Sequence, residues 1–396
     1  MPVAAALGTP NNVDVVVIGA GLAGLCTARS LADARLSVLL VDRKPSITYG
    51  IHTSGIFVRR TFDEFDLPGG CLGSPIRHVN LYSPAGTKIE LQSPRPEFRI
   101  GRMERLYAEM LKRCRRAGVR VLLETTFESS VDRSQHLLVS LRQRAHSIRV
   151  ASRFLIGADG AQSQVAEDLN LSLNRKWIVG VEHVYRNAPP GGPPSLHCFL
   201  DPLLAPGYLC WIAHDRDEVH LGVAGNPARF RPLQALQRFR KRAANVVNLD
   251  AAEFIENRGG RIPVGGVLPR IASRRGLLVG DAAGAVSPLT AGGLDPCLRL
   301  SRLASSVAAQ FLTTGDESVL NVYNGKRFRR RFLGRRLLRS LLEACRHPWI
   351  MEAGCQLLRT SPGRAVAARL FFGDFSFPDP APRLQPIAPI DASSSR

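Results

Sequence analysis

The sequence predicts an α/β fold in which a nucleotide-binding domain is interleaved with a smaller mixed β-sheet domain and followed by C-terminal helices. Two observations lead to this prediction. A β-branched run at residues 15–18 leads into a glycine-rich turn and a helix-like segment, which is the pattern of a parallel βαβ unit. Residues 171–266 instead contain several short strand-like segments, typical of a separate sheet. With 396 residues, the chain is long enough for both.

The first element to justify is the turn after residue 18, where residues 19–24 read Gly-x-Gly-x-x-Gly. The first glycine permits the sharp turn, the second lets a pyrophosphate approach the backbone, and the third allows the helix to pack close to the strand. A second strand, residues 36–41, ends in an acid where such folds bind the adenosine ribose. The unit therefore predicts an ADP-containing ligand without distinguishing NAD from FAD. The predicted contacts are Gly19, Gly21, Leu22, Ala23, Gly24, Asp42 and Arg43.

Two later segments decide between these cofactors. Residues 155–166 read LIGADGAQSQVA, and residues 277–294 read LLVGDAAGAVSPLTAGGL. With the first turn, they resemble in order the three motifs of the FAD-dependent oxidoreductases of the p-hydroxybenzoate hydroxylase superfamily. The resemblance implies FAD as the cofactor. It also implies that FAD is bound by Asp159, Gly280, Asp281, Gly292, Gly293 and Leu294.

The last motif also makes physical sense as a flavin site. A reduced flavin carries negative charge at the pyrimidine end of its ring, and a helix that begins after Gly293 offers unpaired N–H groups and a positive partial charge there. Asp295 and Pro296 depart from the family's pattern. Proline is tolerated in a first helical turn. Asp295 either opposes flavin reduction or caps the helix, and we expect the cap.

The resemblance implies a Rossmann-like FAD-binding domain made of separated segments. It also places a flavin-facing loop at residues 52–57 and an FAD-contacting arginine, matched by Arg102, at the start of an amphipathic helix. Residues 373–396 are rich in proline and end in serines, which predicts a flexible tail. The expected units are residues 12–82, 97–170 and 267–330 for FAD, 83–96 and 171–266 for the substrate, 331–372 as C-terminal helices, and the tail.

Residues 205–225, APGYLCWIAHDRDEVHLGVAG, resemble a strand pair of the geranylgeranyl reductases within this superfamily. Tyr208 and Trp211 match, and they would provide flat apolar walls for a hydrophobic substrate, with core packing as the alternative. Many of those reductases have cysteine where Ser54 stands here, so the catalytic residues and the proton source are not identified. The lysine-containing and W-x-W-x-I-P motifs of the flavin halogenases are absent, which disfavours halogenation.

The resemblance therefore implies reduction of an alkene in a hydrophobic, for example prenylated, substrate. NAD(P)H would act as a transient electron donor, docking without a second Gly-x-Gly-x-x-Gly domain. One alternative is a monooxygenase that hydroxylates or epoxidises its substrate through a peroxyflavin. Another is a flavin-binding protein without catalysis. The substrate and the oligomeric state are left open.

The chain is strongly basic, with 53 Lys and Arg against 33 Asp and Glu and a net charge of +20. Residues 326–342 concentrate this charge around Leu333, Leu337 and Leu341. Because arginines fall on both sides of these leucines, we expect a poorly separated apolar face. Loose contact with an anionic membrane stays open. No RNA- or DNA-binding motif is present, so nucleic acid is not expected as a partner.

The remaining features predict a cytoplasmic protein, either free or at the inner face of the membrane. The eight cysteines show no C-x-x-C spacing, which indicates neither a zinc site nor a disulfide scaffold. His214 and His220 are interpreted as ordinary surface or strand residues. No apolar run approaches the ~20 residues that span a bilayer. Residues 1–12 lack the cationic start of a signal peptide, so secretion is not expected.

Overall fold

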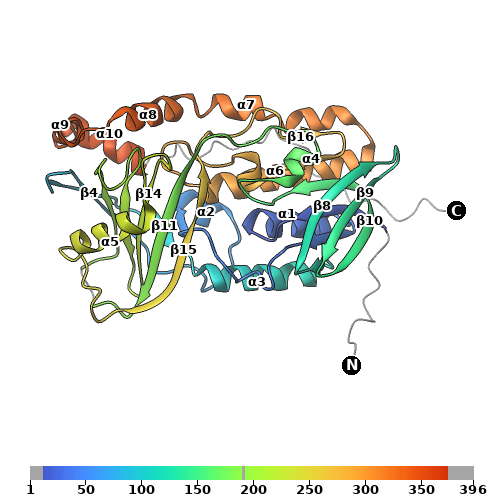
Figure 1. Cartoon of the computed structure of the whole chain (residues 1–396), viewed down its shortest axis with the longest axis horizontal. Coiled ribbons are helices and arrows are strands. Elements are labelled where there is room, and N and C mark those ends of the chain that lie inside the picture. The colour runs from blue at the N-terminus through green and yellow to red at the C-terminus, as the bar shows by residue number, and fades with distance from the viewer. Residues whose placement is uncertain (1–11, 190–191, 373–396) are drawn as a thin grey trace.

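The computed structural model describes residues 12–189 and 192–372 of the chain. Figure 1 shows two sheets next to each other along the long axis, with the C-terminal helices running along one edge of the molecule. The predictions made for residues 1–11 and 373–396 lie outside the described residues.

The first sheet has eight strands and contains the predicted βαβ unit. Its strands are β1 (Asn12–Ile18), β2 (Val38–Val41), β7 (Arg120–Leu122), β8 (Thr125–Asp132), β9 (Leu137–Gln143), β10 (His146–Gly157), β16 (Ala272–Ser273) and β17 (Gly276–Leu278). β1 pairs in parallel with β2 and β10, β2 with β7, and β10 with β17. The apolar run at residues 15–18 is buried because β1 lies in the middle of this parallel group.

Three long helices belong to the same domain: α1 (Leu22–Asp33), α3 (Met103–Arg116) and α6 (Leu294–Thr314). The predicted amphipathic helix is α3, which buries Met103, Leu106, Met110 and Cys114. α1 packs against both α3 and α6. Short elements complete the domain, namely α2 (Arg59–Glu64), α4 (Gln164–Asp168), η1 (Gly280–Ala283) and η2 (Glu317–Val322).

The second sheet has seven strands in the order β15-β11-β14-β13-β12-β4-β5. They are β4 (His78–Tyr82), β5 (Lys88–Gln92), β11 (Trp177–Arg186), β12 (Ser195–Phe199), β13 (Cys210–His214), β14 (Glu218–Gly225) and β15 (Glu253–Pro263). Helix α5 (Pro232–Ala243) packs on β11 and β14. A ribbon of β3 (Ile56–Val58) and β6 (Phe98–Ile100) stands apart from both large sheets.

The structure moves one predicted domain boundary. Residues 78–82 were expected in the first FAD segment, but β4 lies in the second sheet, parallel to β12 and antiparallel to β5. The hairpin between β4 and β5 decides this, because its two strands share a sheet. The boundary therefore falls before residue 78.

The chain ends in α7 (Gly325–Arg330), α8 (Leu333–Ala344), α9 (Pro348–Leu358) and α10 (Ser361–Phe372). Phe328 and Phe332 are buried in the core of the first domain. Cys355 of α9 and Ala367 of α10 are buried in a cluster with residues of the second sheet. Among the described residues, no helix is both long and apolar enough to cross a membrane. The α/β architecture with C-terminal helices is as predicted.

Candidate flavin site

The predicted pyrophosphate turn connects β1 to α1. Gly19 has a φ of +103°, and a Cβ atom there would lie 2.3 Å from the Ala158 carbonyl oxygen. A Cβ at Gly24 would lie 1.8 Å from the Gly19 carbonyl oxygen, so α1 can approach the strand this closely only without a side chain. A Cβ at Gly21 would meet no atom within 4 Å. The turn is thus closely packed at its first and third glycines and open at the second, where the motif predicts the pyrophosphate.

The start of α1 is suited to an anion. Gly21 is its N-cap, no side chain caps the helix, and the first turn, which includes Leu22 and Ala23, carries no acidic residue. A helix N-terminus of this kind presents backbone N–H groups and a positive partial charge. Asp42 follows β2 and accepts hydrogen bonds from the N–H groups of Ala20 (2.6 Å) and Lys44 (2.9 Å). Its neighbour Arg43 is exposed.

Asp159 lies beside the same turn, because a Cβ at Gly19 would come within 3.0 Å of the Asp159 backbone nitrogen. The Ser163 hydroxyl donates to its Oδ1 at 2.6 Å, and the Val165 N–H donates to its Oδ2 at 3.1 Å. Burial raises the pKa of Asp159, although these hydrogen bonds oppose the shift. In this structure the carboxylate holds the start of α4.

The glycine segment at residues 280–293 meets the N-terminus of α1. A Cβ at Gly280 would lie 2.8 Å from the Ala23 Cβ, and one at Gly293 would lie 3.7 Å from the Asp281 Oδ1. Burial raises the pKa of Asp281 to about 6. Gly293 is the N-cap of α6, and no side chain caps that helix either. Gly280 therefore contacts the start of α1, and α1 and α6 both begin without a side-chain cap.

Asn174 links the second and third motifs. Its side-chain Nδ2 donates to the carbonyl oxygens of Ala161 at 3.1 Å and Asp281 at 2.8 Å. Asn174 is buried, and both hydrogens of its amide are used. The sequence analysis missed this residue because it belongs to no motif.

Asp295 does not have the cap role that the sequence predicted. Its Oδ1 accepts hydrogen bonds from the Thr61 hydroxyl at 3.1 Å and from the Arg299 Nε at 2.9 Å. Arg299 lies one turn further along α6, and it also donates to Glu64 at 2.7 Å. The carboxylate therefore pairs with this arginine and leaves the N–H groups at the start of α6 uncapped.

Comparison with known proteins agrees with this geometry. A family model described as an FAD binding domain matches residues 12–189. The chain is an FAD-dependent oxidoreductase. Its similarity is to the geranylgeranyl-reductase-like branch of the p-hydroxybenzoate hydroxylase superfamily.

The relatives of this flavoprotein include two archaeal proteins named digeranylgeranylglycerophospholipid reductase. The one from Methanocella arvoryzae is 24% identical over 316 residues, covering 78% of this chain and 80% of the relative. The one from Methanosphaera stadtmanae is 28% identical over 323 residues, with the same coverage of 78% and 80%.

Solved structures show the same fold. A geranylgeranyl bacteriochlorophyll reductase-like protein from Thermoplasma acidophilum superposes with a TM-score of 0.80 at 18% identity, covering 92% of this chain and 98% of that chain. The p-nitrophenol 4-monooxygenase of Pseudomonas putida gives a TM-score of 0.66 at 17% identity, covering 92% of this chain and 95% of that chain.

Tyr208 and Trp211 are held by the flavoprotein's own polar groups. The Tyr208 hydroxyl donates to the Thr290 carbonyl oxygen at 2.6 Å, and the Trp211 Nε1 donates to Glu182 Oε2 at 2.7 Å. Both rings belong to a small apolar cluster of the second sheet that also contacts Ala291, directly before Gly292 and Gly293. The cluster therefore joins the second sheet to the turn that precedes α6. Contact of the two rings with a substrate stays a prediction.

Arg102, predicted to contact FAD, pairs with three carboxylates in the structure. It is the N-cap residue of α3, and its guanidinium donates to Asp215 at 2.8 Å, Asp217 at 3.0 Å and Glu218 at 3.1 Å. Asp215 and Glu218 are buried carboxylates, which need a cation beside them. Arg102 thus links α3 to the turn between β13 and β14, and its contact with FAD stays a prediction.

His220 is a strand residue as expected, but it is fully buried rather than on the surface. Its Nδ1 lies 3.0 Å from Glu182 Oε1, and its Nε2 lies 3.3 Å from Glu218 Oε2. Burial alone would lower the pKa of His220, but the two carboxylates outweigh it and raise the pKa. His214 is buried as well. This network was invisible in the sequence because it needs two paired strands.

Arg258 connects the same network to the loop that the family resemblance places at the flavin. Its Nη1 donates to the carbonyl oxygens of Thr53 at 3.1 Å and Ser54 at 3.3 Å, and lies 3.8 Å from Glu182 Oε1. The side chain of Arg258 is almost completely buried. The position of the loop thus depends on β15 of the second domain. No motif identified Arg258.

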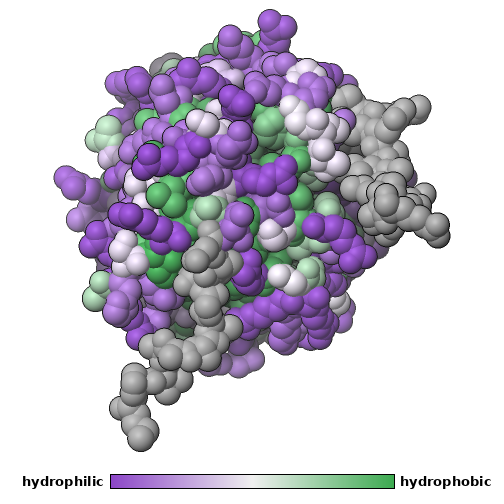
Figure 2. Space-filling view, turned by 90° about the vertical axis from the view of Figure 1, so that its right-hand side faces the viewer, coloured by the Kyte–Doolittle hydropathy of each residue, from purple (hydrophilic) through white to green (hydrophobic). Residues whose placement is uncertain are grey.

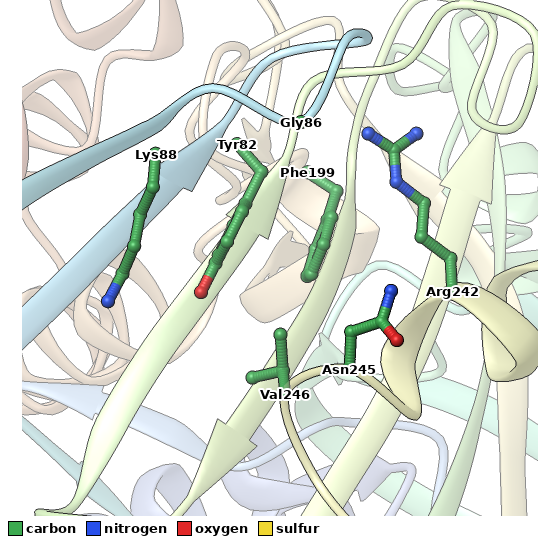
Figure 3. Close-up of a pocket in the computed structure, with 7 residues that line it drawn as sticks. All are labelled: Tyr82, Gly86, Lys88, Phe199, Arg242, Asn245 and Val246. Carbon is green, nitrogen blue, oxygen red and sulfur yellow. The ribbon is translucent and has the colours of Figure 1, made fainter.

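A cavity of about 370 Å³ lies elsewhere, between β4, β5, β12 and the end of α5. Figure 3 shows Tyr82 and Phe199 side by side in it, and their ring centres are 4.3 Å apart. Its two cations already have partners, since Arg242 donates to Asp201 at 2.7 Å and Lys88 pairs with Glu90. None of the predicted site residues lines this cavity.

Proposed function

We propose that this flavoprotein reduces a carbon–carbon double bond in a hydrophobic, prenyl-containing substrate, with NAD(P)H as the electron donor. One observation carries the proposal. The apolar cluster that contains Ile178, Tyr208, Ala224 and Val264 contacts Ala291, immediately before the Gly292–Gly293 turn predicted to face the flavin. An apolar environment at this place favours a hydrophobic substrate over a polar one. The names of the archaeal relatives support a prenyl chain.

The residues at the site fit FAD, because the turn is open at Gly21 and the helices that begin after Gly21 and Gly293 have no side-chain cap. Bound FAD supplies two-electron redox chemistry at its ring. The N-terminus of α6 would stabilise the negative charge of the reduced form through its N–H groups and partial positive charge. Gly280 and Asp281 would hold the ribityl chain. In the overall reaction, NAD(P)H and one proton are consumed, and the alkene gains one hydrogen on each carbon.

Monooxygenation is the second candidate, because the fold is shared with a p-nitrophenol 4-monooxygenase. The two reactions differ in their need for oxygen. Reduction of an alkene proceeds without O₂, whereas a monooxygenase consumes O₂ and leaves one oxygen atom in the product.

The test is an anaerobic incubation of the purified holoprotein with NADPH and a geranylgeranyl lipid, followed by mass spectrometry. We expect products that gain H₂ for each reduced double bond. Gly19→Val is the matched control, because its side chain would collide with the Ala158 carbonyl, and we expect it to lack both flavin absorbance and activity. A product that forms only in air and carries an added oxygen would reject the reductase and support the monooxygenase.

We further propose that the protein works in the cytoplasm and meets its substrate at the inner face of a membrane. The lipid-like substrate class and the net charge of +20 support this location. Fractionation of cells that express the full chain tests it. Recovery in the membrane fraction that is reversed by high salt is expected, and recovery outside the cell would overturn it.

A further inference from the structure

Helix α8 has its polar and apolar faces reversed relative to an ordinary surface helix. Four of its leucines are exposed, with exposed fractions of 58% for Leu333, 64% for Leu337, 46% for Leu338 and 56% for Leu341. They share one face, because residues spaced by three or four positions are neighbours on a helix. A soluble surface helix would bury this face.

The opposite face of α8 carries arginines that point into the protein. Arg339 is buried, its guanidinium lies 5.6 Å from the centre of the Tyr208 ring, and its Nε donates to Glu343 at 2.8 Å. Arg335 donates to the Ser287 hydroxyl at 3.2 Å. From the sequence, arginines on both sides of the leucines were expected to interrupt the apolar face. The structure corrects this, because these two arginines turn inward and leave the leucine face clean.

We propose that this leucine face (Leu333, Leu337, Leu338 and Leu341) inserts into the surface of an anionic phospholipid bilayer. Such helices lie in the headgroup region with the apolar face in the acyl chains and basic residues at the headgroups. Residues 326–372 contain twelve Lys and Arg and only two acids, which gives the charge complement of anionic lipid.

Exposed cations flank α8 in the chain on both sides. Lys326, Arg327 and Arg330 are exposed just before α8, and Arg346 is exposed just after it. Each basic residue near an anionic leaflet contributes about 1 kcal/mol to binding. Trp349 at the start of α9 has an exposed fraction of 70%, and a tryptophan is well suited to the membrane interface.

Figure 2 shows that the end formed by the first domain carries mainly hydrophilic residues, with smaller hydrophobic patches between them. Figure 1 shows α7, α8, α9 and α10 along a single edge of the molecule, so the exposed leucines of α8 and the exposed cations of α7 belong to elements of that edge. This separation favours a lipid surface over a nucleic acid, which would not need the leucines.

The surface also lies next to the predicted substrate side. Arg339 covers the Tyr208 ring, and a Cβ at Gly207 would lie 3.2 Å from the Glu343 Cγ. A bilayer bound to α8 would therefore be one helix away from the apolar cluster that contacts Ala291. This part of the inference rests on the proposed function, since a membrane lipid as substrate would gain direct access.

The test is co-sedimentation of the full-length holoprotein with vesicles of phosphatidylcholine, with and without phosphatidylglycerol. We expect binding to the anionic vesicles that weakens at high salt. Replacing all four leucines of α8 by serine should weaken binding roughly a hundredfold, because each half-exposed leucine contributes a few-fold. The matched control replaces Leu203 and Leu233 by serine. These leucines lie outside α8 and are 70% and 68% exposed, and this variant should bind vesicles as the wild type does. FAD content and thermal unfolding confirm that the variants are folded.

Several outcomes would overturn the proposal. They are vesicle binding that is equal in the leucine variant and the wild type, binding to duplex DNA with none to vesicles, or a dimer without lipid that the leucine variant dissociates. The vesicle assay needs no substrate or donor. Vesicle binding through the leucines by a protein that reduces no alkene would therefore reject the proposed function alone. The leucine variant should still reduce a substrate dispersed in detergent at the wild-type rate.

Discussion

Alanine substitutions at Gly21 and Gly24 should separate cofactor binding from folding, although both glycines belong to the same turn. At Gly24, a Cβ would lie 1.8 Å from the Gly19 carbonyl oxygen. Contacts under 3.0 Å are essentially never found, so the helix must move by at least 1.2 Å, the difference between 3.0 Å and 1.8 Å. Such overpacking costs about 1–3 kcal/mol, which exceeds the gain of up to about 1 kcal/mol from alanine in a helix. Gly24→Ala should therefore destabilise the apoprotein and weaken FAD binding together.

Gly21→Ala should behave differently. Its Cβ meets no protein atom within 4 Å, and its backbone is extended, with φ −73° and ψ −177°, which any residue adopts. The apoprotein should keep its stability within about 0.5 kcal/mol. If the pyrophosphate lies against Gly21, the added methyl group would overlap with it. A steric cost of about 1–3 kcal/mol would weaken FAD binding roughly 10- to 100-fold.

The assay has two parts, both done on flavin-free protein. Denaturant unfolding gives stability, and quenching of FAD fluorescence on titration gives the dissociation constant. Gly354→Ala in α9, which also has no atom within 4 Å of its Cβ, is the control and should leave FAD affinity unchanged. Wild-type FAD affinity in Gly21→Ala would refute the placement of the pyrophosphate. An unchanged free energy of unfolding in Gly24→Ala would refute the packing argument.

Three further predictions concern polar residues that join separate segments of the chain, namely Asn174, Glu218 and Arg102. Asn174→Ala leaves two part-buried carbonyl groups without this donor, so the free energy of unfolding should fall by about 1–3 kcal/mol. FAD titration should also show weaker binding. Unchanged values in both assays would contradict the linking role. The pKa of Glu218 is lowered from 4.5 to about 2, because the hydrogen bond from His220 and the charge of Arg102 outweigh the effect of burial. The contribution of Glu218 to stability is therefore present above pH 4.5 and is lost as the pH falls toward 2. Glu218→Gln should flatten the acid limb of a stability-against-pH profile, and an unaltered limb would count against this assignment. Arg102→Ala should destabilise the protein by about 3–5 kcal/mol, since it leaves buried Asp215 without its cation. The FAD affinity of the folded protein should stay as in the wild type. Selective loss of FAD binding would instead support the contact predicted from the sequence.

The glycine turns could be predicted because they follow from local backbone rules. Gly19 needs a positive φ, and Gly24 needs the absence of a side chain, whatever the rest of the chain does. The buried parallel strands were equally visible, since a short continuous β-branched run is typical of a strand buried on both faces. The amphipathic pattern of residues 103–114 likewise predicted α3 and its buried face.

Residues whose partners lie far away in the chain could not be assigned. Arg102 resembles a cofactor ligand in the sequence, but the turn between β13 and β14 brings three carboxylates to it. Asn174 and Arg258 carry no motif, and each acts by holding backbone carbonyls of another segment. His220 becomes a buried, doubly paired imidazole only when β11 and β14 lie together.

The sequence by itself therefore determined the α/β class, the FAD motifs and the strand, turn and helix around each of them, because these depend on neighbours within a few positions. The tertiary structure alone decided that Gly280 packs against Ala23 at the start of α1, and that β4 joins the second sheet. It also decided that Arg335 and Arg339 of α8 face inward while four leucines of this helix are exposed. The physical reason is that a pattern of residues defines which faces of an element differ, whereas the surfaces packed against the element decide which face is buried.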